Sequence, residues 1–267
     1  MSHPITHCPT IRRPLHLLLF LLIGLYSCQP EGTARLMSYN IRNGIGMDGV
    51  NDLQRVADVI NACRPDVVAV QEIDSMTSRS GGRDVLGELA ALTGMMPVYA
   101  PAIDYDGGKY GVGILCRTEP LAVVRMPLPG REERRMVVAA EFHDYVFACT
   151  HLSLTAADRM LSLPILQEVA SRRAGKPFYL AGDFNAGPGE PFIRSLAGQF
   201  TILTDTTVRT YPADVPDITI DYIVRFGGQR AGKSTRQRVN ADCPQPAGLS
   251  VASDHRPVYI DIKYKKK

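Results

Sequence analysis

Short apolar runs that each end in a polar, chemically capable residue recur along the chain. Runs of this kind, bounded by turn-forming residues, are typical of buried β-strands. Five of these runs, with the polar residues that follow them, are residues 35–39 before Asn40, 67–70 before Gln71 and Glu72, 146–149 before Thr150 and His151, 178–181 before Asp183 and Asn185, and 218–220 before Asp221. We therefore expect a fold in which strand ends meet at one rim and bring these side chains together.

Helical patterns separate some of the predicted strands. The predicted helices cover residues 53–62 (capped by Asn51 or Asp52), 84–92, and a stretch from a Thr155 cap to near Gly175. Residues 137–141 and 146–150 are typical of a hairpin. A few helices among about ten short strands indicate an α/β fold. We expect two mixed β-sheets packed face to face with the helices outside.

The N-terminus is typical of a targeting signal. Arg12 and Arg13 precede an apolar run over residues 15–26 that is too short for a comfortable membrane span. The run leads to Cys28 in a sequence that resembles a bacterial lipoprotein cleavage box, which implies cleavage before Cys28 and lipidation of its thiol. The alternative is an ordinary secretory signal or an uncleaved anchor. The predicted organisation is a signal peptide (1–27), a lipidated tether (28–33) and one domain (34–267).

The charge balance argues against a polybasic nucleic-acid binder. The chain has 30 Lys and Arg against 27 Asp and Glu, and its formal charge of +3 falls to +1 when Arg12 and Arg13 leave with the signal. With 45% apolar and 21% charged residues, the composition is typical of a globular protein and excludes disordered, collagen-like and multi-span membrane chains.

Cys116 and Cys149 lie in apolar runs, and we expect them to be small buried core residues.

Nine polar residues form the chemically capable set: Asn40, Glu72, Tyr110, His151, Asp183, Asn185, Asp221, Asp254 and His255. Their carboxylates and amides are hard oxygen ligands that suit Mg²⁺, Mn²⁺ or Ca²⁺. The cysteines show no zinc-ligand spacing, so a thiolate zinc site is not expected. Imidazoles beside carboxylates suit a phosphoester hydrolase, which needs a cation against the phosphate charge, a base for water, and donors to the transition state.

Several short motifs carry a family resemblance. They are, in chain order, residues 38–40 (SYN), 71–74 (QEID), 110–115 (YGVGIL), 150–152 (THL), 182–185 (GDFN), 220–223 (IDYI) and 253–258 (SDHRPV). Together and in this order, they resemble the endonuclease/exonuclease/phosphatase superfamily over about residues 34–262. The resemblance is to the deoxyribonuclease and sphingomyelinase branches, and it implies a four-layered α/β sandwich with its site at one rim.

The resemblance also implies roles on the metal and water side of the site. Glu72 matches the principal metal ligand, Asn40 lies beside it, and Asp254 matches a further acidic residue that serves a metal. Asp183 and Asn185 match the pair that activates water and holds a phosphate oxygen. The implied cofactor is Mg²⁺, with Mn²⁺ or Ca²⁺ as alternatives.

The remaining roles concern the phosphate. His255 matches the imidazole on the scissile phosphate, and Asp221 would accept its other N–H. His151 matches the second histidine of these branches, and Tyr110 matches a phosphate-contacting aromatic residue. The sequence leaves open whether Asp183 or His255 is the base. Taken singly, each of these residues is at least as often a turn or core residue as a catalytic one. A structural role for all of them would need every one of these coincidences at once, so we favour the active-site interpretation.

The chain departs from the family pattern at two positions. Val112 stands where the deoxyribonuclease has the glutamate partner of its second histidine, and Thr219 replaces an arginine common before the Asp-Tyr motif. Arg42 and Lys109 follow or precede motif residues and are candidate substrate-binding cations, although a turn and a solvated lysine explain them as well. The loop over residues 210–217 is a candidate specificity element.

Three functions are compatible with these observations. The first is a metal-dependent phosphodiesterase or phosphatase that acts outside the cytoplasm, by in-line attack of activated water on a phosphate ester. The second is an exported nuclease, which the low charge does not favour. The third is a non-catalytic binding lipoprotein. The expected protein is a monomer held on the periplasmic side of a membrane or on the cell surface through its lipid anchor.

Overall fold

The computed structural model describes residues 1, 31–172, 175–227 and 251–265, and the predicted signal, Cys28 and the adjoining tether up to residue 30 lie outside them. The first sheet contains, in spatial order, β11 (Val258–Lys265), β1 (Glu31–Asn40), β2 (Val67–Ser75), β4 (Gly108–Cys116) and β3 (Met96–Tyr105). The second contains β5 (Ala122–Leu128), β6 (Arg135–Glu141), β7 (Val146–His151), β8 (Phe178–Asp183), β10 (Asp221–Phe226) and β9 (Phe200–Ile202). The helices are η1 (Arg42–Gly44), α1 (Leu53–Cys63), α2 (Val85–Thr93), α3 (Ala156–Ser171) and α4 (Pro191–Leu196).

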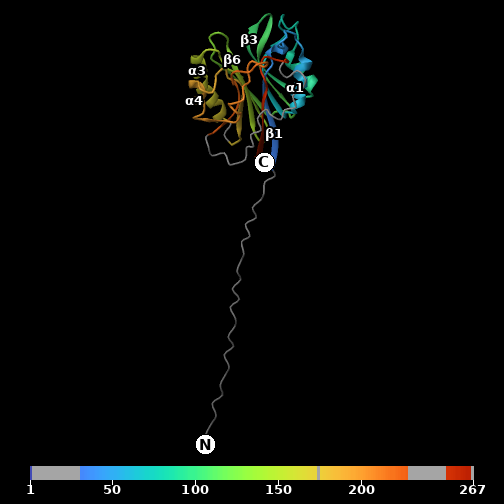
Figure 1. The fold of residues 1–267 in the computed structure, drawn as a ribbon. Helices are drawn as coiled ribbons and strands as arrows, with labels where there is room; N and C mark the ends of the chain where they lie inside the picture. The colour runs from blue at the N-terminus through green and yellow to red at the C-terminus, as the bar shows by residue number, and fades with distance from the viewer. Residues whose placement is uncertain (2–30, 173–174, 228–250, 266–267) are drawn as a thin grey trace.

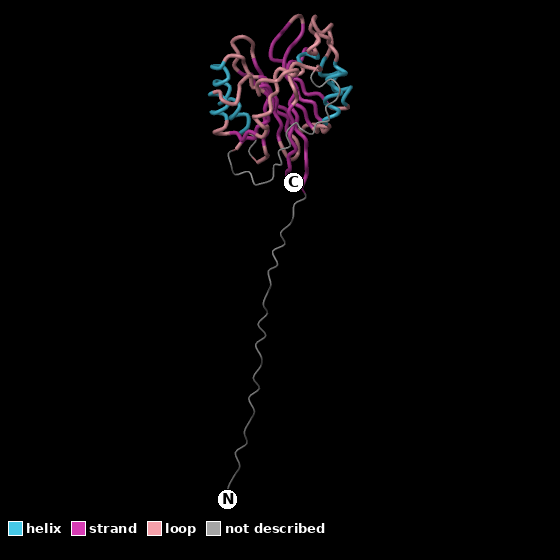
Figure 2. The backbone as a smooth tube through the Cα atoms, in the orientation of Figure 1, coloured by secondary structure: helices cyan, strands magenta, loops and turns pink. Residues whose placement is uncertain are grey.

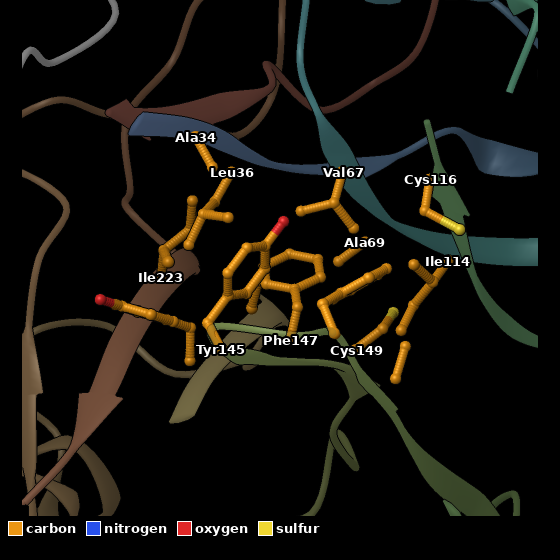
Figure 3. Close-up of a cluster of buried hydrophobic side chains, with 14 of the residues drawn as sticks. Ala34, Leu36, Val67, Ala69, Ile114, Cys116, Tyr145, Phe147, Cys149 and Ile223 are labelled. Atoms are coloured by element: carbon orange, nitrogen blue, oxygen red, sulfur yellow. The ribbon is translucent and has the colours of Figure 1, made fainter. Parts of the chain in front are cut away.

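The two sheets pack face to face, and helices cover both outer faces (Figures 1 and 2). Between the sheets, Leu36 and Val67 lie opposite Phe147 and Ile223 in one buried cluster (Figure 3). A second cluster joins the first sheet to α1 and α2, and a third joins the second sheet to α3 and α4. This arrangement confirms the predicted four-layered α/β sandwich. Strands covered on both faces are apolar without alternation, which explains the continuous run over residues 67–70.

Strand pairing brings the polar strand ends to one rim. β1 and β2 are parallel, with Asn40 opposite Gln71, and β7 and β8 are parallel, with His151 opposite Asp183. Parallel neighbours end at the same edge of a sheet. Figure 1 shows this rim at the end of the molecule opposite the C-terminus. The predicted hairpin of residues 137–141 and 146–150 is confirmed as the antiparallel pair β6–β7.

Two sequence predictions are wrong in detail. Asp221 does not end a strand over residues 218–220 but begins β10, whose antiparallel pairing with β8 places Asp221 opposite Asp183. Thr155 is the N-cap residue of α3, as predicted, but its hydroxyl makes no capping hydrogen bond, because it donates to Glu132 Oε2 at 3.2 Å instead. The helix also ends earlier than predicted, at Ser171. Asp52, and not Asn51, caps α1 through the backbone amides of the first turn.

None of the helices in the described part of the chain is long and apolar enough to cross a membrane.

Candidate active site

Asn40 joins the two sheets at the rim. This fully buried residue ends β1, and its Nδ2 donates to Glu72 Oε1 at 2.9 Å and to Asp183 Oδ2 at 3.1 Å. Its Oδ1 accepts from the backbone N–H of Arg42 at 3.1 Å. Both amide hydrogens are therefore used by carboxylates that come from different sheets, which fixes the side chain and holds Glu72 and Asp183 toward each other.

His255 is held between two buried aspartates. Its Nδ1 lies 3.0 Å from Asp221 Oδ2, and its Nε2 lies 3.7 Å from Asp183 Oδ2. Burial lowers the pKa of His255, but the charges of Asp221 and Asp183 and the hydrogen bond to Asp221 outweigh it and raise the pKa to about 10. Asp221 thus accepts a hydrogen bond from Nδ1–H, which orients the ring with Nε2 toward Asp183.

Asp183 is where the polar groups of the site converge. Burial raises its pKa to about 7 against the opposing charge of His255. His151 Nε2 lies 3.4 Å from Asp183 Oδ2, and the backbone N–H of Asn185 donates to Asp183 Oδ1 at 2.9 Å. The side-chain amide of Asn185 donates to the Leu152 carbonyl at 2.9 Å. The backbone of Asn185 has a φ of 48°, which turns the chain sharply after β8. The carboxylate is therefore oriented through both oxygens.

His151 is a neutral imidazole in this setting. Burial lowers its pKa well below the usual value, and the charges of Arg135 and His255 lower it further. With Val112 at the position of the family's glutamate, His151 contacts Asp183 instead of a carboxylate on β4.

Glu72 and Asp254 form the acidic side of the site. Glu72 sits at a β-bulge in β2 with a φ of 59°, which directs its side chain out of the strand ladder. Burial raises its pKa, and the charge of Asp254 raises it further against the hydrogen bond from Asn40. Ser253 Oγ donates to the Asn40 carbonyl at 2.7 Å and anchors the segment that carries Asp254.

These oxygens fit a divalent cation. Two neighbouring half-buried carboxylates, Glu72 and Asp254, are stabilised when a cation offsets their repulsion, and Asn40 holds Glu72 through its Nδ2. A second set, Asp183, Asp221 and His255, also brings its ligand atoms within 4.8 Å of one another. Asp221 and His255 already satisfy each other through the Nδ1 hydrogen bond, so Glu72 and Asp254 are the better place for a hard cation.

The comparisons with known proteins agree with this architecture. A sequence profile of the Endonuclease/Exonuclease/phosphatase family matches residues 37–255. The chain belongs to the endonuclease/exonuclease/phosphatase family. Members of this family are metal-dependent hydrolases of phosphoesters. No curated protein matches the chain.

Solved structures of the endonuclease/exonuclease/phosphatase fold resemble the whole domain. A family member from Beutenbergia cavernae has a TM-score of 0.64 at 20% identity, covering 87% of this chain and 72% of that chain. A mannosyl-6-phosphatase from Bacteroides thetaiotaomicron has a TM-score of 0.61 at 16% identity, covering 85% and 98%. The catalytic domain of human Nocturnin with a bound sulfate has a TM-score of 0.61 at 17% identity, covering 88% and 97%. At these identities the likeness establishes the fold alone.

Tyr110 and Arg135 lie near Glu72 and Glu133. Burial strongly raises the pKa of Tyr110, and the charges of Glu72 and Glu133 raise it further. Arg135 is only 6% exposed, and its Nη1 lies 3.1 Å from Glu133 Oε1. Burial raises the pKa of Glu72, and the positive charge of Arg135 lowers it. A buried cation therefore lies near the acidic side of the site.

Arg135 is absent from the residues predicted from sequence because it begins a strand. A polar residue that precedes an apolar run is not part of the pattern of polar residues that follow such runs. In the β6–β7 hairpin, Val137 pairs with Thr150, so the start of β6 lies beside the end of β7 that carries His151. A lone arginine before an apolar run, in the first strand of a predicted hairpin, is the signal that would have identified it.

The two predicted substrate-binding cations lie at the edges of the site. Arg42 Nε lies 3.6 Å from Asp254 Oδ2, and the arginine side chain is 43% exposed. Lys109 pairs with Asp104 on the β3–β4 hairpin and does not join the central cluster. Cys28 lies outside the described residues.

Proposed function

We propose that the protein is a divalent-metal-dependent phosphoesterase that acts outside the cytoplasm on small phosphate esters. The observation that carries this proposal is the buried cluster in which Asn40 connects Glu72 to Asp183 while Asp221 orients His255. Such a cluster places a proton acceptor, a cationic imidazole and an acidic cation site around one point at the rim. This combination serves the attack of water on a phosphate better than any other common reaction.

Asp183 is the base in this proposal. Its carboxylate accepts the proton of the attacking water, whose oxygen bonds to phosphorus as the bond to the leaving oxygen breaks. Asn40 and the backbone N–H of Asn185 hold the carboxylate in place. The leaving alkoxide takes a proton from solvent.

His255 and His151 stabilise the negative charge of the phosphate and orient the groups around it. Because Asp221 keeps His255 protonated, its Nε2–H faces the phosphate oxygens as a charged donor. Neutral His151 donates from Nε2 to Asp183 or to a phosphate oxygen. Tyr110 and Arg135 lie near Glu72, where Arg135 adds positive charge.

Glu72 and Asp254 would hold the metal. Asn40, predicted as a further ligand, directs its Nδ2 toward Glu72 and would hold that carboxylate in place. When bound there, a divalent cation neutralises phosphate charge and makes phosphorus more electrophilic. Mg²⁺ is the cation we expect, since the donors are carboxylate oxygens without a thiolate.

Charge, one structural neighbour and a disulfide support the proposed substrate class and compartment. The balanced charge of the mature chain does not favour a nucleic-acid polyanion. One solved structure of similar fold is described as a mannosyl-6-phosphatase, which supports a small phosphomonoester. Cys63 is disulfide-bonded, a state typical of exported proteins, and this agrees with the predicted signal.

A substrate panel tests the proposal. We expect the purified protein to hydrolyse bis(p-nitrophenyl) phosphate, p-nitrophenyl phosphate or inositol phosphates with Mg²⁺ or Mn²⁺ and to lose this activity in EDTA. Sphingomyelin, plasmid DNA and single-stranded nucleic acid complete the panel. Product release is followed by absorbance and by phosphate assay.

Each contrary outcome selects an alternative. Cleavage of nucleic acid alone identifies an exported nuclease. Activity that EDTA leaves unchanged removes the metal from the mechanism. No hydrolysis of any substrate identifies a non-catalytic binding lipoprotein.

The lipid anchor is tested separately. We expect wild-type protein to fractionate with membranes, and Cys28→Ser to fractionate with the soluble exported proteins because it lacks the thiol that is acylated. Immunoblots of both fractions and metabolic labelling with a palmitate analogue measure this. Cys149→Ser is the control, since its thiol is buried between the sheets. Membrane retention of Cys28→Ser would mean that an uncleaved segment holds the protein.

A further inference from the structure

Arg79 connects a buried carboxylate to an aromatic residue of the candidate active site. It lies in the turn between β2 and α2. Asp74, which is fully buried, lies opposite Tyr110 in the β2–β4 pair. The guanidinium carbon of Arg79 lies 4.4 Å from the centre of the Tyr105 ring and 5.4 Å from the centre of the Tyr110 ring. Both distances are within the roughly 6 Å over which an aromatic face attracts a cation, so Arg79 packs on both rings.

The guanidinium of Arg79 is fixed in one orientation. Its Nε donates to Asp74 Oδ2 at 2.6 Å and its Nη2 donates to Asp74 Oδ1 at 2.8 Å, and these two bonds together set the plane of the group. Thr77 Oγ1 donates to the same carboxylate at 2.8 Å and holds it in turn. The third nitrogen, Nη1, donates to the Tyr105 hydroxyl at 3.3 Å. All three guanidinium nitrogens are therefore engaged.

The backbone around Arg79 is anchored to the β3–β4 turn. The backbone N–H of Ser78 donates to the Asp106 carbonyl at 2.8 Å, and the backbone N–H of Arg79 donates to Asp106 Oδ2 at 2.6 Å. Asp106 lies between β3 and β4, four residues before Tyr110. Figure 1 shows β3 at the rim end of the molecule. The turn that carries Arg79 and the hairpin that carries Tyr110 are therefore held together at the rim.

Tyr110 has no polar anchor of its own. Within the described residues, its hydroxyl makes no hydrogen bond. Its ring is held by packing, with the guanidinium of Arg79 on it and the centre of the Tyr105 ring 6.1 Å away at an angle of 49°. Burial strongly raises the pKa of this phenol and the charge of Glu72 raises it further, so the group stays protonated within electrostatic reach of the acidic side of the site. The O–H is thus an unused donor whose direction depends on the groups packed on its ring.

The charge of Arg79 also acts on this donor. Against burial and the charge of Glu72, the positive charges of Arg135 and Arg79 lower the pKa of Tyr110. Positive charge near a phenol makes its O–H a stronger hydrogen-bond donor to an anion. A residue that only stabilised the turn through Asp74 would not need to lie over the Tyr110 ring.

We propose that Arg79 is a positioning residue for phosphoester hydrolysis, and that it fixes the ring of Tyr110 so that the phenol O–H donates to an oxygen of the substrate phosphate. The proposal rests on the proposed function and adds to it a residue that acts through Tyr110 and does not touch the substrate. It also gives the turn between β2 and α2 a part in the reaction.

A double-mutant cycle tests whether Arg79 acts through Tyr110. The measurement is kcat and KM for bis(p-nitrophenyl) phosphate, or for the best substrate of the panel. We expect Tyr110→Phe to lower kcat/KM by about tenfold, the loss of one hydrogen bond to a charged group. Arg79→Met should lower kcat/KM by about fivefold in the wild-type background, mainly through kcat. In the Tyr110→Phe background, Arg79→Met should change it by less than about twofold, since the donor that it orients is already gone.

Two further variants separate positioning from stability. Arg79→Met leaves the charge of Asp74 buried without its partner, so we expect a lower midpoint of thermal unfolding. Combining it with Asp74→Asn removes that charge and should raise the midpoint again without restoring activity. Arg35→Met is the matched control, because Arg35 donates to Asp261 at 2.7 and 2.9 Å and lies 4.7 Å from the Tyr259 ring. It should lower the unfolding midpoint and change kcat/KM by less than about twofold.

Several outcomes would overturn the role of Arg79 and leave the phosphoesterase standing. They are equal loss from Arg79→Met in both backgrounds, no loss in either background, and full recovery of activity when Asp74→Asn is added. If no ester is hydrolysed, the proposed function fails, and calorimetric titration with inorganic phosphate decides the role of Arg79. Phosphate binding that Arg79→Met weakens only when Tyr110 is present supports the assignment, and any other result overturns it.

Discussion

Replacing Asp183 with asparagine is expected to lower kcat by about 10²- to 10⁴-fold, the range for a positioned proton acceptor. Asp183 is the residue on which Asn40, His151 and His255 converge. An asparagine has nearly the same shape but accepts no proton from water. The measurement is kcat for bis(p-nitrophenyl) phosphate at saturating Mg²⁺, or for the best substrate of the panel.

The stability of this variant separates catalysis from folding. Because burial disfavours the charged form of Asp183, Asp183→Asn should keep or raise the midpoint of thermal unfolding while it loses activity. Asp58→Asn, an exposed position on α1, is the matched control and should change neither quantity. Near-full turnover by Asp183→Asn would move the base to His255.

Glu72→Gln is expected to weaken Mg²⁺ binding by at least about 100-fold, since even residues that only orient a metal ligand contribute 10- to 100-fold to affinity. A glutamine preserves the acceptor for Asn40 but removes the charge that faces the cation. Activity should fall at low Mg²⁺ and recover in part at high Mg²⁺. Calorimetric titration of the metal and the Mg²⁺ dependence of kcat/KM measure the two effects independently.

Glu88→Gln is the control for this experiment. Glu88 lies on the outer helix α2, where it pairs with Arg83, so its replacement should leave metal binding unchanged. If Glu72→Gln binds Mg²⁺ as wild type does, the cation belongs to the alternative set of Asp183, Asp221 and His255. Asp221→Asn should then be the variant that loses the metal.

The strand-end pattern predicted much of the site because parallel strands in one sheet end at the same edge. Asn40 ends β1, and Glu72 lies at the bulge of its parallel neighbour β2, which continues to Ser75 and does not end at residue 70 as predicted. His151 and Asp183 end the parallel strands β7 and β8. Local sequence is sufficient to recognise each run, since a strand buried on both faces is apolar throughout. The rule fails where pairing is antiparallel, and Asp221 and Arg135 therefore reach the rim from the start of their strands.

Other features depend on contacts between segments far apart in the chain. Thr155 has the sequence of a helix cap, yet its hydroxyl bonds Glu132 from another loop. Lys109 directly precedes the motif residue Tyr110, which made it a candidate phosphate-binding cation. In the structure it pairs with Asp104 across its own hairpin. Local propensity contains no information about a partner that only the folded chain supplies.

The sequence by itself determined the sandwich, its rim and the types of residue available for chemistry, because strand burial and strand-end polarity are written in short stretches of chain. Only the tertiary structure decided which of these residues touch. The hydrogen bonds that link Asn40 to Glu72 and Asp183, and the burial that raises the pKa of Asp183, require the two sheets to be packed together. Distance and desolvation are properties of that packing, and no single segment of the sequence contains them.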